Sequence, residues 1–312
     1  MRQMASTYST LLAFIMAALF ISGGAAHATG PEVERPKKPA DPLIGPPFVT
    51  CKAWVIADGH TGEILAGGNE DEQRNPASIT KIMTALVVLK LAEESPDVWE
   101  ETITFSERAD KTVGSSCRLN AGESLPVKEL LYGLMLPSGN DASVAIAEHF
   151  GPRLAMENEN GYDAFIRTMC ETAKQLGMER TSYVNPHGLT HETHLTTAAD
   201  MVKLTCEAMK YERFRDTVAT RNHSTIVNTP EGEDRTVSWT NTNRLLAQEG
   251  YLGVKTGTTT AAGACLVSCA ERNEKRLVMV VLGSTSSDAR YVDARNLYRW
   301  IWKEIAAESQ DE

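Results

Sequence analysis

The sequence predicts a mixed α/β (α+β) fold, in which helices flank one antiparallel sheet and an all-helical subdomain is inserted between its strands. Apolar strand-like runs occur near both ends of the folded region, at residues 52–66 and 250–283. Between them, residues 76–210 are rich in helix formers with helical periodicity. The simplest packing joins the two ends in one sheet, with residues 91–240 as the inserted subdomain.

The first elements are a hairpin and a buried helix. Strands are expected at residues 52–57 and 62–66, because the turn-forming sequence DGHTG separates them. A helix then runs from Pro76 to Lys90. It is apolar nearly all round, so we expect it at the centre of the protein.

Four more helices, three strands and a last helix complete the predicted order. The helices are expected at 126–135, 141–149, 161–177 and 196–210. The strands, joined by short turns, are expected at 250–257, 263–272 and 276–283. A final helix is expected at 287–307, before an acidic tail at 308–312.

The N-terminus has the pattern of a secretory signal peptide. Arg2 precedes an apolar run, Leu11 to Ile21, and Ala26-His27-Ala28 has the small residues of a cleavage site. The run is shorter than the roughly 20 residues that a membrane-spanning helix needs. We therefore expect cleavage after residue 28, export to the periplasm or cell envelope, and no membrane span in the mature chain. An uncleaved anchor is the alternative.

Residues 29–47 contain six prolines and predict an extended tether, so the folded domain is expected at 48–307. The net charge is −10, which argues against nucleic acid or anionic lipid as a partner. The six cysteines could form disulfides after export, in any of 15 pairings, or could remain buried thiols.

Three short motifs carry the chemistry, and the first is Ser78-Ile-Thr-Lys81. Ser78 falls in the first helical turn, where backbone N–H groups are free and the helix dipole is positive. Lys81 lies one turn further on the same face, so its amine can take the hydroxyl proton. This requires burial or a nearby cation to disfavour the charged amine. Alone, the motif would fit a helix cap with a surface lysine better than a catalytic pair.

The second motif, Ser138-Gly139-Asn140, is a turn ahead of a helix. Ser138 could relay a proton to a leaving amine, and Asn140 could hold Lys81 and a substrate amide. Turn and cap chemistry alone also favours these residue types.

The third motif, Lys255-Thr256-Gly257, interrupts a strand that otherwise has core character. Lys255 and Thr256 would bind a substrate carboxylate through charge-assisted hydrogen bonds. Gly257 would allow close approach of an extended peptide that pairs with the strand. Backbone N–H groups of Ser78 and Thr258 would then form an oxyanion hole.

In this order, the three motifs resemble those of D-alanyl-D-alanine carboxypeptidases, the low-molecular-mass penicillin-binding proteins of the S11 peptidase family. The resemblance covers residues 50–307 and includes six further segments: Pro76-Ala77-Ser78, Leu176-Gly177-Met178, Asn185 to Leu189, Thr196-Thr197-Ala198, Asn241-Thr242-Asn243 and Gly253 to Gly257.

The resemblance implies a β-lactamase/D,D-peptidase-like fold and a serine acyl-enzyme that needs no cofactor. Its substrates would be peptidoglycan stem peptides ending in D-Ala-D-Ala, and β-lactams would acylate the same residue, Ser78. Arg290 stands where the family places an arginine that binds the terminal carboxylate.

One motif narrows the resemblance, and two features depart from the family pattern. Its middle motif is Ser-Gly-Asn, as in the carboxypeptidases, and not the Ser-Asp-Asn of class A β-lactamases. Thr258 occupies a position where many relatives carry histidine. A chain that stops after the last peptidase helix would lack the β-rich domain and amphipathic anchor of many carboxypeptidases, and in this it would resemble the family's D,D-endopeptidases.

Other functions fit parts of the same pattern. A D,D-endopeptidase and a penicillin-binding sensor that does not turn over both fit the three motifs. A β-lactamase fits less well, because no Glu-x-x-x-Asn motif lies in a suitable loop. A metal site at His187, His191 and His194 is not expected, since their spacing lacks the helical H-E-x-x-H pattern.

Overall fold

The computed structural model describes residues 45–311, with side chains described as far as Ala307. The predicted signal peptide, residues 1–28, and residues 29–44 of the predicted tether lie outside the described residues.

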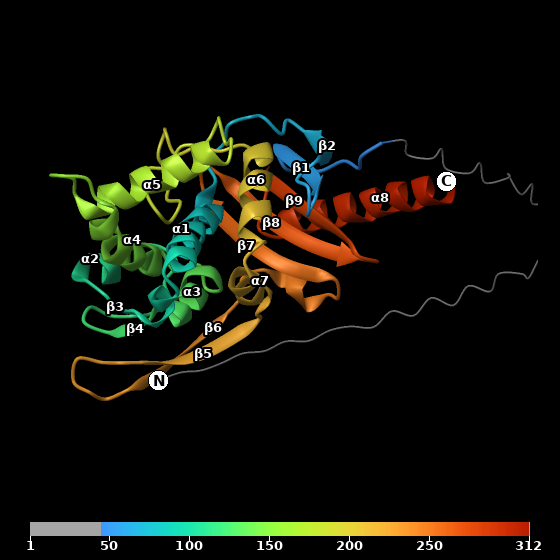
Figure 1. Cartoon of the computed structure of the whole chain (residues 1–312). Helices are drawn as coiled ribbons and strands as arrows, with labels where there is room; N and C mark the ends of the chain where they lie inside the picture. The colour runs from blue at the N-terminus through green and yellow to red at the C-terminus, as the bar shows by residue number, and fades with distance from the viewer. Residues whose placement is uncertain (1–44, 312) are drawn as a thin grey trace, which may run out of the picture. The chain divides into compact units, whose positions relative to one another are not determined.

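Five antiparallel strands form the main sheet, as predicted (Figure 1). Their order is β2-β1-β9-β8-β7. The bounds are β1 (Ala53–Asp58), β2 (Ile64–Gly68), β7 (Tyr251–Thr259), β8 (Gly263–Arg272) and β9 (Lys275–Ser284). Val55 lies opposite Val280, so β1 pairs with β9 and joins the two ends of the folded chain.

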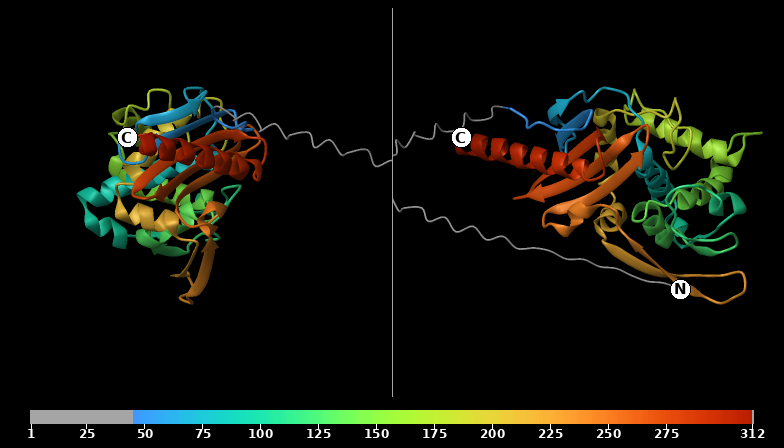
Figure 2. Two further views of the ribbon diagram at one scale, coloured as in Figure 1. Left: turned by 90° about the vertical axis from the view of Figure 1, so that its right-hand side faces the viewer. Right: turned by 180° about the vertical axis from the view of Figure 1, so that it is seen from behind.

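The central strands are buried on both faces, and their side chains alternate between two hydrophobic clusters. Ile56, Met279 and Val281 pack beneath α8 (Ala289–Asp311). Val55, Val278 and Val280 belong to the larger cluster on the other face. There, α6 (Ala198–Ala208) packs against β9 and β1, and α1 (Lys81–Glu94) packs against α6. Seen from behind, in the right-hand view of Figure 2, α8 (red) lies in front of the sheet.

The predicted central helix is confirmed, with a tighter start. A 3₁₀ turn, η1 (Ala77–Thr80), leads directly into α1, whose residues from Lys81 to Leu89 are all buried. The other predicted helices correspond to α3 (Val127–Met135), α4 (Asn140–Leu154), α5 (Gly161–Gln175) and α6. Further helical segments are η2 (Pro96–Glu100), α2 (Glu107–Asp110), α7 (Glu212–Ala219) and η3 (Arg244–Ala247).

The prediction of an all-helical insertion is wrong, because two small sheets lie within it. One pairs β3 (Thr102–Thr104) with β4 (Ser124–Pro126), and the other pairs β5 (Asn222–Val227) with β6 (Arg235–Thr240). Three residues are too few for a readable period in β3. In β6 only Val237 and Trp239 are buried, so the alternating signal is short and was missed.

All six cysteines are buried or half-buried thiols, and none of them forms a disulfide in the described chain. Burial raises the pKa of Cys51 to about 12 and that of Cys265 to about 11. Such thiols are poor nucleophiles at neutral pH. Within residues 45–311, no helix combines the length and the apolar character that crossing a bilayer requires.

Candidate active site

The first two predicted residues are in direct contact. Ser78 lies in η1 and Lys81 opens α1, so the 3₁₀ turn places the Lys81 amine 3.0 Å from Ser78 Oγ. Ser78 is partly exposed, whereas Lys81 is completely buried. The hydroxyl can therefore meet a substrate while the amine behind it stays shielded from water.

Lys81 is held by three acceptors. Besides Ser78, it donates to Asn140 Oδ1 at 2.7 Å and to the backbone carbonyl of His187 at 2.8 Å. Burial lowers the pKa of Lys81 well below its usual value, and the nearby cation Lys255 lowers it further. Asp141 acts in the opposite direction. In its neutral form the amine keeps two N–H donors, for Asn140 and His187, and its lone pair can accept the Ser78 proton, as a general base does.

The Ser138–Asn140 turn borders the same amine. Asn140 begins α4, and its side-chain amide donates to the Val113 carbonyl at 2.8 Å, which orients Oδ1 toward Lys81. Ser138 has a φ of 69°, in the left-handed region that side chains rarely adopt. Its hydroxyl is buried and has no hydrogen-bond partner among the described residues. Strain together with an unpartnered polar atom is typical of functional sites.

Strand β7 brings the third motif alongside η1. It is an edge strand of the main sheet. A Cβ at Gly257 would lie 2.7 Å from the backbone nitrogen of Ser78, so only glycine allows this approach. Lys255 is buried, and its amine donates to the Thr256 carbonyl at 3.1 Å. Burial, with a smaller effect of Arg290, lowers the pKa of Lys255 to about 7.

Arg290 falls inside the predicted last helix and is the second residue of α8. Its guanidinium donates to the Gly257 carbonyl and to Thr258 Oγ1, both at 3.0 Å, and to the Cys265 carbonyl at 3.3 Å. Its Nε is buried without a partner in the described chain. Arg290 thus supports the end of β7 and adds positive charge beside Lys255.

All nine predicted site residues therefore gather where η1, the start of α4, β7 and the start of α8 meet. Three further residues contribute to the site, and the sequence motifs indicated no role for them. His187 supplies the carbonyl that accepts from Lys81. Thr242 shares a hydrogen bond of 2.8 Å with Thr256. Gly188 packs so closely that a Cβ would lie 1.9 Å from the Ala77 carbonyl oxygen.

These contributors lie in segments that the sequence analysis had quoted only for the family resemblance. The turn-forming residues around Pro186 and Gly188 signalled a fixed loop. A role for the backbone carbonyl of His187, in contrast, has no signature in the side-chain sequence. Only the fold shows which carbonyl points at Lys81.

The three histidines near this loop do not converge on a common point. The backbone N–H of Val184 donates to His194 Nδ1 at 3.2 Å, so Nε2 carries the proton and donates to Thr80 Oγ1 at 2.9 Å. Burial lowers the pKa of His194 to about 4 and that of His187 to about 3. Across the described residues, no three His, Cys, Asp or Glu side chains form a group suited to a metal ion.

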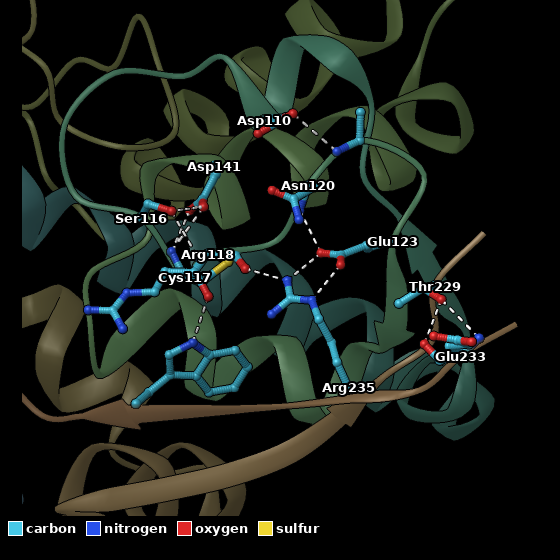
Figure 3. A network of polar contacts seen from close by, with 12 residues as sticks. Asp110, Ser116, Cys117, Arg118, Asn120, Glu123, Asp141, Thr229, Glu233 and Arg235 are labelled. Atoms are coloured by element: carbon cyan, nitrogen blue, oxygen red, sulfur yellow. Dashed lines mark hydrogen bonds and ion pairs between the residues drawn. The ribbon is translucent and has the colours of Figure 1, made fainter. Parts of the chain in front are cut away.

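A polar network behind Asn140 links the site to the β5–β6 hairpin (Figure 3). The buried carboxylate of Asp141 accepts from the backbone N–H of Cys117 at 2.9 Å and from Ser116 Oγ at 2.6 Å. The Cys117 carbonyl accepts from the Trp239 indole of β6 at 2.8 Å. The hairpin thus supports the loop on which Asn140 rests.

The fold and this grouping of side chains define a serine-type peptidase in which a lysine accompanies the serine. Residues 41–286 match the family model described as "Peptidase_S11: D-alanyl-D-alanine carboxypeptidase", and the chain belongs to this family.

Individual relatives agree with this assignment. The chain is 36% identical to "D-alanyl-D-alanine carboxypeptidase DacF" of Bacillus subtilis, covering 77% of this chain and 59% of the relative. It is 34% identical to a D-alanyl-D-alanine carboxypeptidase of Streptomyces sp. strain K15, covering 91% and 97%. It is 31% identical to a D-alanyl-D-alanine endopeptidase of Escherichia coli, covering 82% and 78%.

A solved structure supports the fold. The crystal structure named Streptomyces K15 DD-transpeptidase superposes with a TM-score of 0.76 at 33% identity, covering 82% of this chain and 98% of that one. The present chain therefore spans nearly all of the Streptomyces protein but about three fifths of the Bacillus relative.

Proposed function

We propose that this protein is a serine-type D-Ala-D-Ala carboxypeptidase of peptidoglycan that acts through an acyl-enzyme at Ser78. The single observation that carries the proposal is the contact of Ser78 Oγ with the buried Lys81 amine at 3.0 Å, in a chain of the S11 family. Burial and the charge of Lys255 keep this amine neutral enough to accept a proton.

In the first step Ser78 Oγ attacks the carbonyl carbon of the penultimate D-Ala, and its proton passes to Lys81 Nζ. Collapse of the tetrahedral intermediate breaks the peptide bond. The unpartnered hydroxyl of Ser138 relays the proton to the leaving amine, which departs as free D-Ala. Water then attacks the acyl-enzyme and restores Ser78. Asn140 holds Lys81 and the substrate amide during both steps.

Recognition relies on strand β7 and its neighbours. An extended stem peptide would pair with this edge strand, as peptides add to exposed sheet edges elsewhere. Lys255 and Thr256 would bind the terminal carboxylate, with Arg290 adding positive charge behind them. The backbone N–H groups of Ser78 and Thr258 would stabilise the oxyanion, and Gly257 permits the close approach that this requires.

The test is release of free D-Ala from a peptide ending in D-Ala-D-Ala, with Ser78→Ala as the control. Labelled penicillin should attach covalently to the native protein and not to Ser78→Ala. Labelling of Ser78→Ala would overturn the nucleophile assignment. Stable penicillin labelling without any release of D-Ala would instead indicate a sensor that does not turn over.

A D,D-endopeptidase is the second candidate, favoured by the identity of 31% to the Escherichia coli endopeptidase over 78% of that protein. Cross-linked muropeptides offered beside the linear peptide separate the two functions. A carboxypeptidase releases D-Ala faster than it separates cross-linked dimers, and an endopeptidase does the reverse.

We also propose that residues 1–28 are removed on export and that 29–47 form a tether, so that the domain at 48–307 acts in the cell envelope, as the family's cell-wall substrates require. The N-terminal sequence of protein recovered from the envelope fraction checks this. A mature chain that still begins at Met1 would indicate the uncleaved anchor.

A further inference from the structure

A second pocket lies away from Ser78, between α8 and the start of β7. It has a volume of about 440 Å³, within the usual range of ligand pockets. We call it the basic–aromatic pocket and define it by three aromatic residues and four cations: Tyr251, Tyr298, Trp302, Arg272, Arg295, Arg299 and Lys303. The function proposed above gives it no role.

The cations of this pocket are arranged at an energetic cost. Arg295, Arg299 and Lys303 follow one another at intervals of four residues, on one face of α8. Like charges at this spacing destabilise a helix. None of the three, nor Arg272, forms an ion pair with any described acidic residue, although Arg167 elsewhere binds two glutamates.

This cluster also stands out against the charge of the whole protein, which is −10. An uncompensated group of four cations creates a local positive field that attracts anions. A bound anion would remove the repulsion between the helix positions. The cluster is therefore suited to a negatively charged ligand.

The pocket floor adds a different kind of recognition. Tyr298 is buried, shares a hydrogen bond of 3.0 Å with Ser268 Oγ, and meets Tyr251 edge to face at 5.4 Å. The Arg272 guanidinium stacks on the ring of Trp302 at 5.5 Å. The indole Nε1 of Trp302 is buried and has no acceptor among the described residues. Rigid aromatic walls and a spare donor suit a ligand that has both an apolar face and acceptor oxygens.

We propose that the basic–aromatic pocket is a second binding site for an anionic glycan. A sugar ring would lie against Tyr251 and Trp302, while its carboxylate or phosphate groups bind Arg295, Arg299 and Lys303. Tyr251 precedes Lys255 on β7 by four residues, so the two sites are separated by roughly 13 Å along the strand. A polymer bound at the pocket would raise the effective concentration of its stem peptides near Ser78.

The pocket itself is inferred from its own residues, and only the link to stem peptides rests on the proposed function. Binding is therefore measured in the Ser78→Ala background, where no substrate is consumed. The probes are a soluble disaccharide–tetrapeptide muropeptide, a phosphomannan, neutral dextran and vesicles of anionic phospholipid. The test variant is R295Q/R299Q/K303Q, and the control K111Q/K174Q/K210Q removes the same charge from exposed lysines elsewhere.

We expect at least one anionic probe to bind, and the test variant to weaken that binding by about tenfold or more while the control does not. The muropeptide and phosphomannan arms distinguish carboxylate from phosphate as the recognised group. In the otherwise native protein, the test variant should cleave a short D-Ala-D-Ala peptide at the normal rate. If the native protein does not cleave this peptide, the proposed function is contradicted, but the proposed glycan site is not.

If the control variant loses binding as much as the test variant does, the proposal is overturned, because the net charge of the protein would then explain the binding of the probe. Binding of dextran as tight as that of the anionic probes would also overturn it, as would no binding of either anionic probe. Binding only to anionic phospholipid vesicles, abolished in the test variant, would replace the glycan with a lipid surface.

Discussion

Arg235 on β6 donates two hydrogen bonds to the carboxylate of Glu123, one from Nε and one from a terminal nitrogen (Figure 3). The same guanidinium donates to the Arg118 carbonyl at 2.6 Å. Glu123 in turn accepts from the backbone N–H of Asn120 at 2.7 Å. A hairpin remote in sequence thereby fixes the loop whose Ser115 carbonyl accepts from the Asn140 backbone at 2.7 Å.

Replacing Arg235 with Gln should therefore lower the free energy of unfolding by about 1–2 kcal/mol at pH 7, because a buried carboxylate loses charge-assisted partners. Arg235 holds the pKa of Glu123 below its usual value. This stabilisation is complete above the unfolded pKa, about 4.3, and is lost as the pH falls through the folded pKa.

Urea denaturation at pH 7 and pH 3 measures this difference. The difference in unfolding free energy between the native protein and Arg235→Gln should be smaller at pH 3 than at pH 7. The control, Lys111→Gln, breaks the exposed pair with Glu107 and should change stability by less than about 0.5 kcal/mol. If the difference in unfolding free energy between the two proteins is the same at pH 7 and pH 3, Arg235 does not lower the pKa of Glu123.

The second prediction concerns the pH dependence of kcat/KM for a D-Ala-D-Ala peptide. Lys81 must be neutral to accept a proton, so activity should rise with pH through its lowered pKa. Lys255 must be charged to bind the carboxylate, so activity should fall as the pH rises through about 7.

The variant Lys255→Arg tests the alkaline limb, because arginine stays charged throughout this range. We expect its kcat/KM to be lower but to show no decline between pH 7 and 9. An unchanged alkaline limb in Lys255→Arg would assign that limb to another group.

The third prediction concerns Gly257. A Cβ there would meet the Ser78 backbone nitrogen at 2.7 Å, so Gly257→Ala should push β7 away from η1. We expect a loss of about 100-fold in kcat/KM and in the rate of penicillin acylation, as when an oxyanion donor is removed. Thr259→Ala on the same strand is the control. Full activity in Gly257→Ala would mean that the two backbones need not be this close.

The fourth prediction concerns His194, which is buried and neutral between Val184 and Thr80. Its pKa lies at about 4, whereas an unfolded histidine titrates near 6.5. The unfolded chain then binds more protons between these values, so stability should fall as the pH drops from about 6.5 to 4.

In His194→Gln that part of the acid destabilisation should vanish, while stability at pH 7 falls by about 1–3 kcal/mol through lost hydrogen bonds. Thermal unfolding at pH 7 and pH 5 compares the two proteins. An identical pH slope would show that His194 does not titrate in this range. His187, whose pKa is also lowered, is present in both proteins and contributes equally to their acid destabilisation.

The sequence predicted the site best where a residue type is rare in its setting, such as a lysine within an apolar strand. A serine one turn before a lysine predicted the Ser78–Lys81 contact that the structure contains. A lysine inside an apolar strand, Lys255, indicated that this strand belongs to the site. The sheet itself followed from long apolar runs at the two ends of the chain. These runs are continuous and easy to recognise because both faces of the central strands are buried.

What the sequence could not predict depends on backbone groups and on short elements. The carbonyl of His187 and the close approach of Gly188 to Ala77 arise from loop geometry, which leaves no side-chain pattern. The β5–β6 hairpin was missed because one of its faces is exposed and only Val237 and Trp239 mark the other. Both features nevertheless determine how Lys81 and Asn140 are held.

The strand order β2-β1-β9-β8-β7 also constrains how the chain can fold during synthesis. When β1 leaves the ribosome, its neighbour β9 is still more than 200 residues from being made. Such non-local pairing slows folding, because a long loop must close before the contact forms. The N-terminal hairpin must therefore wait, with one edge unpaired, until the last quarter of the polypeptide emerges.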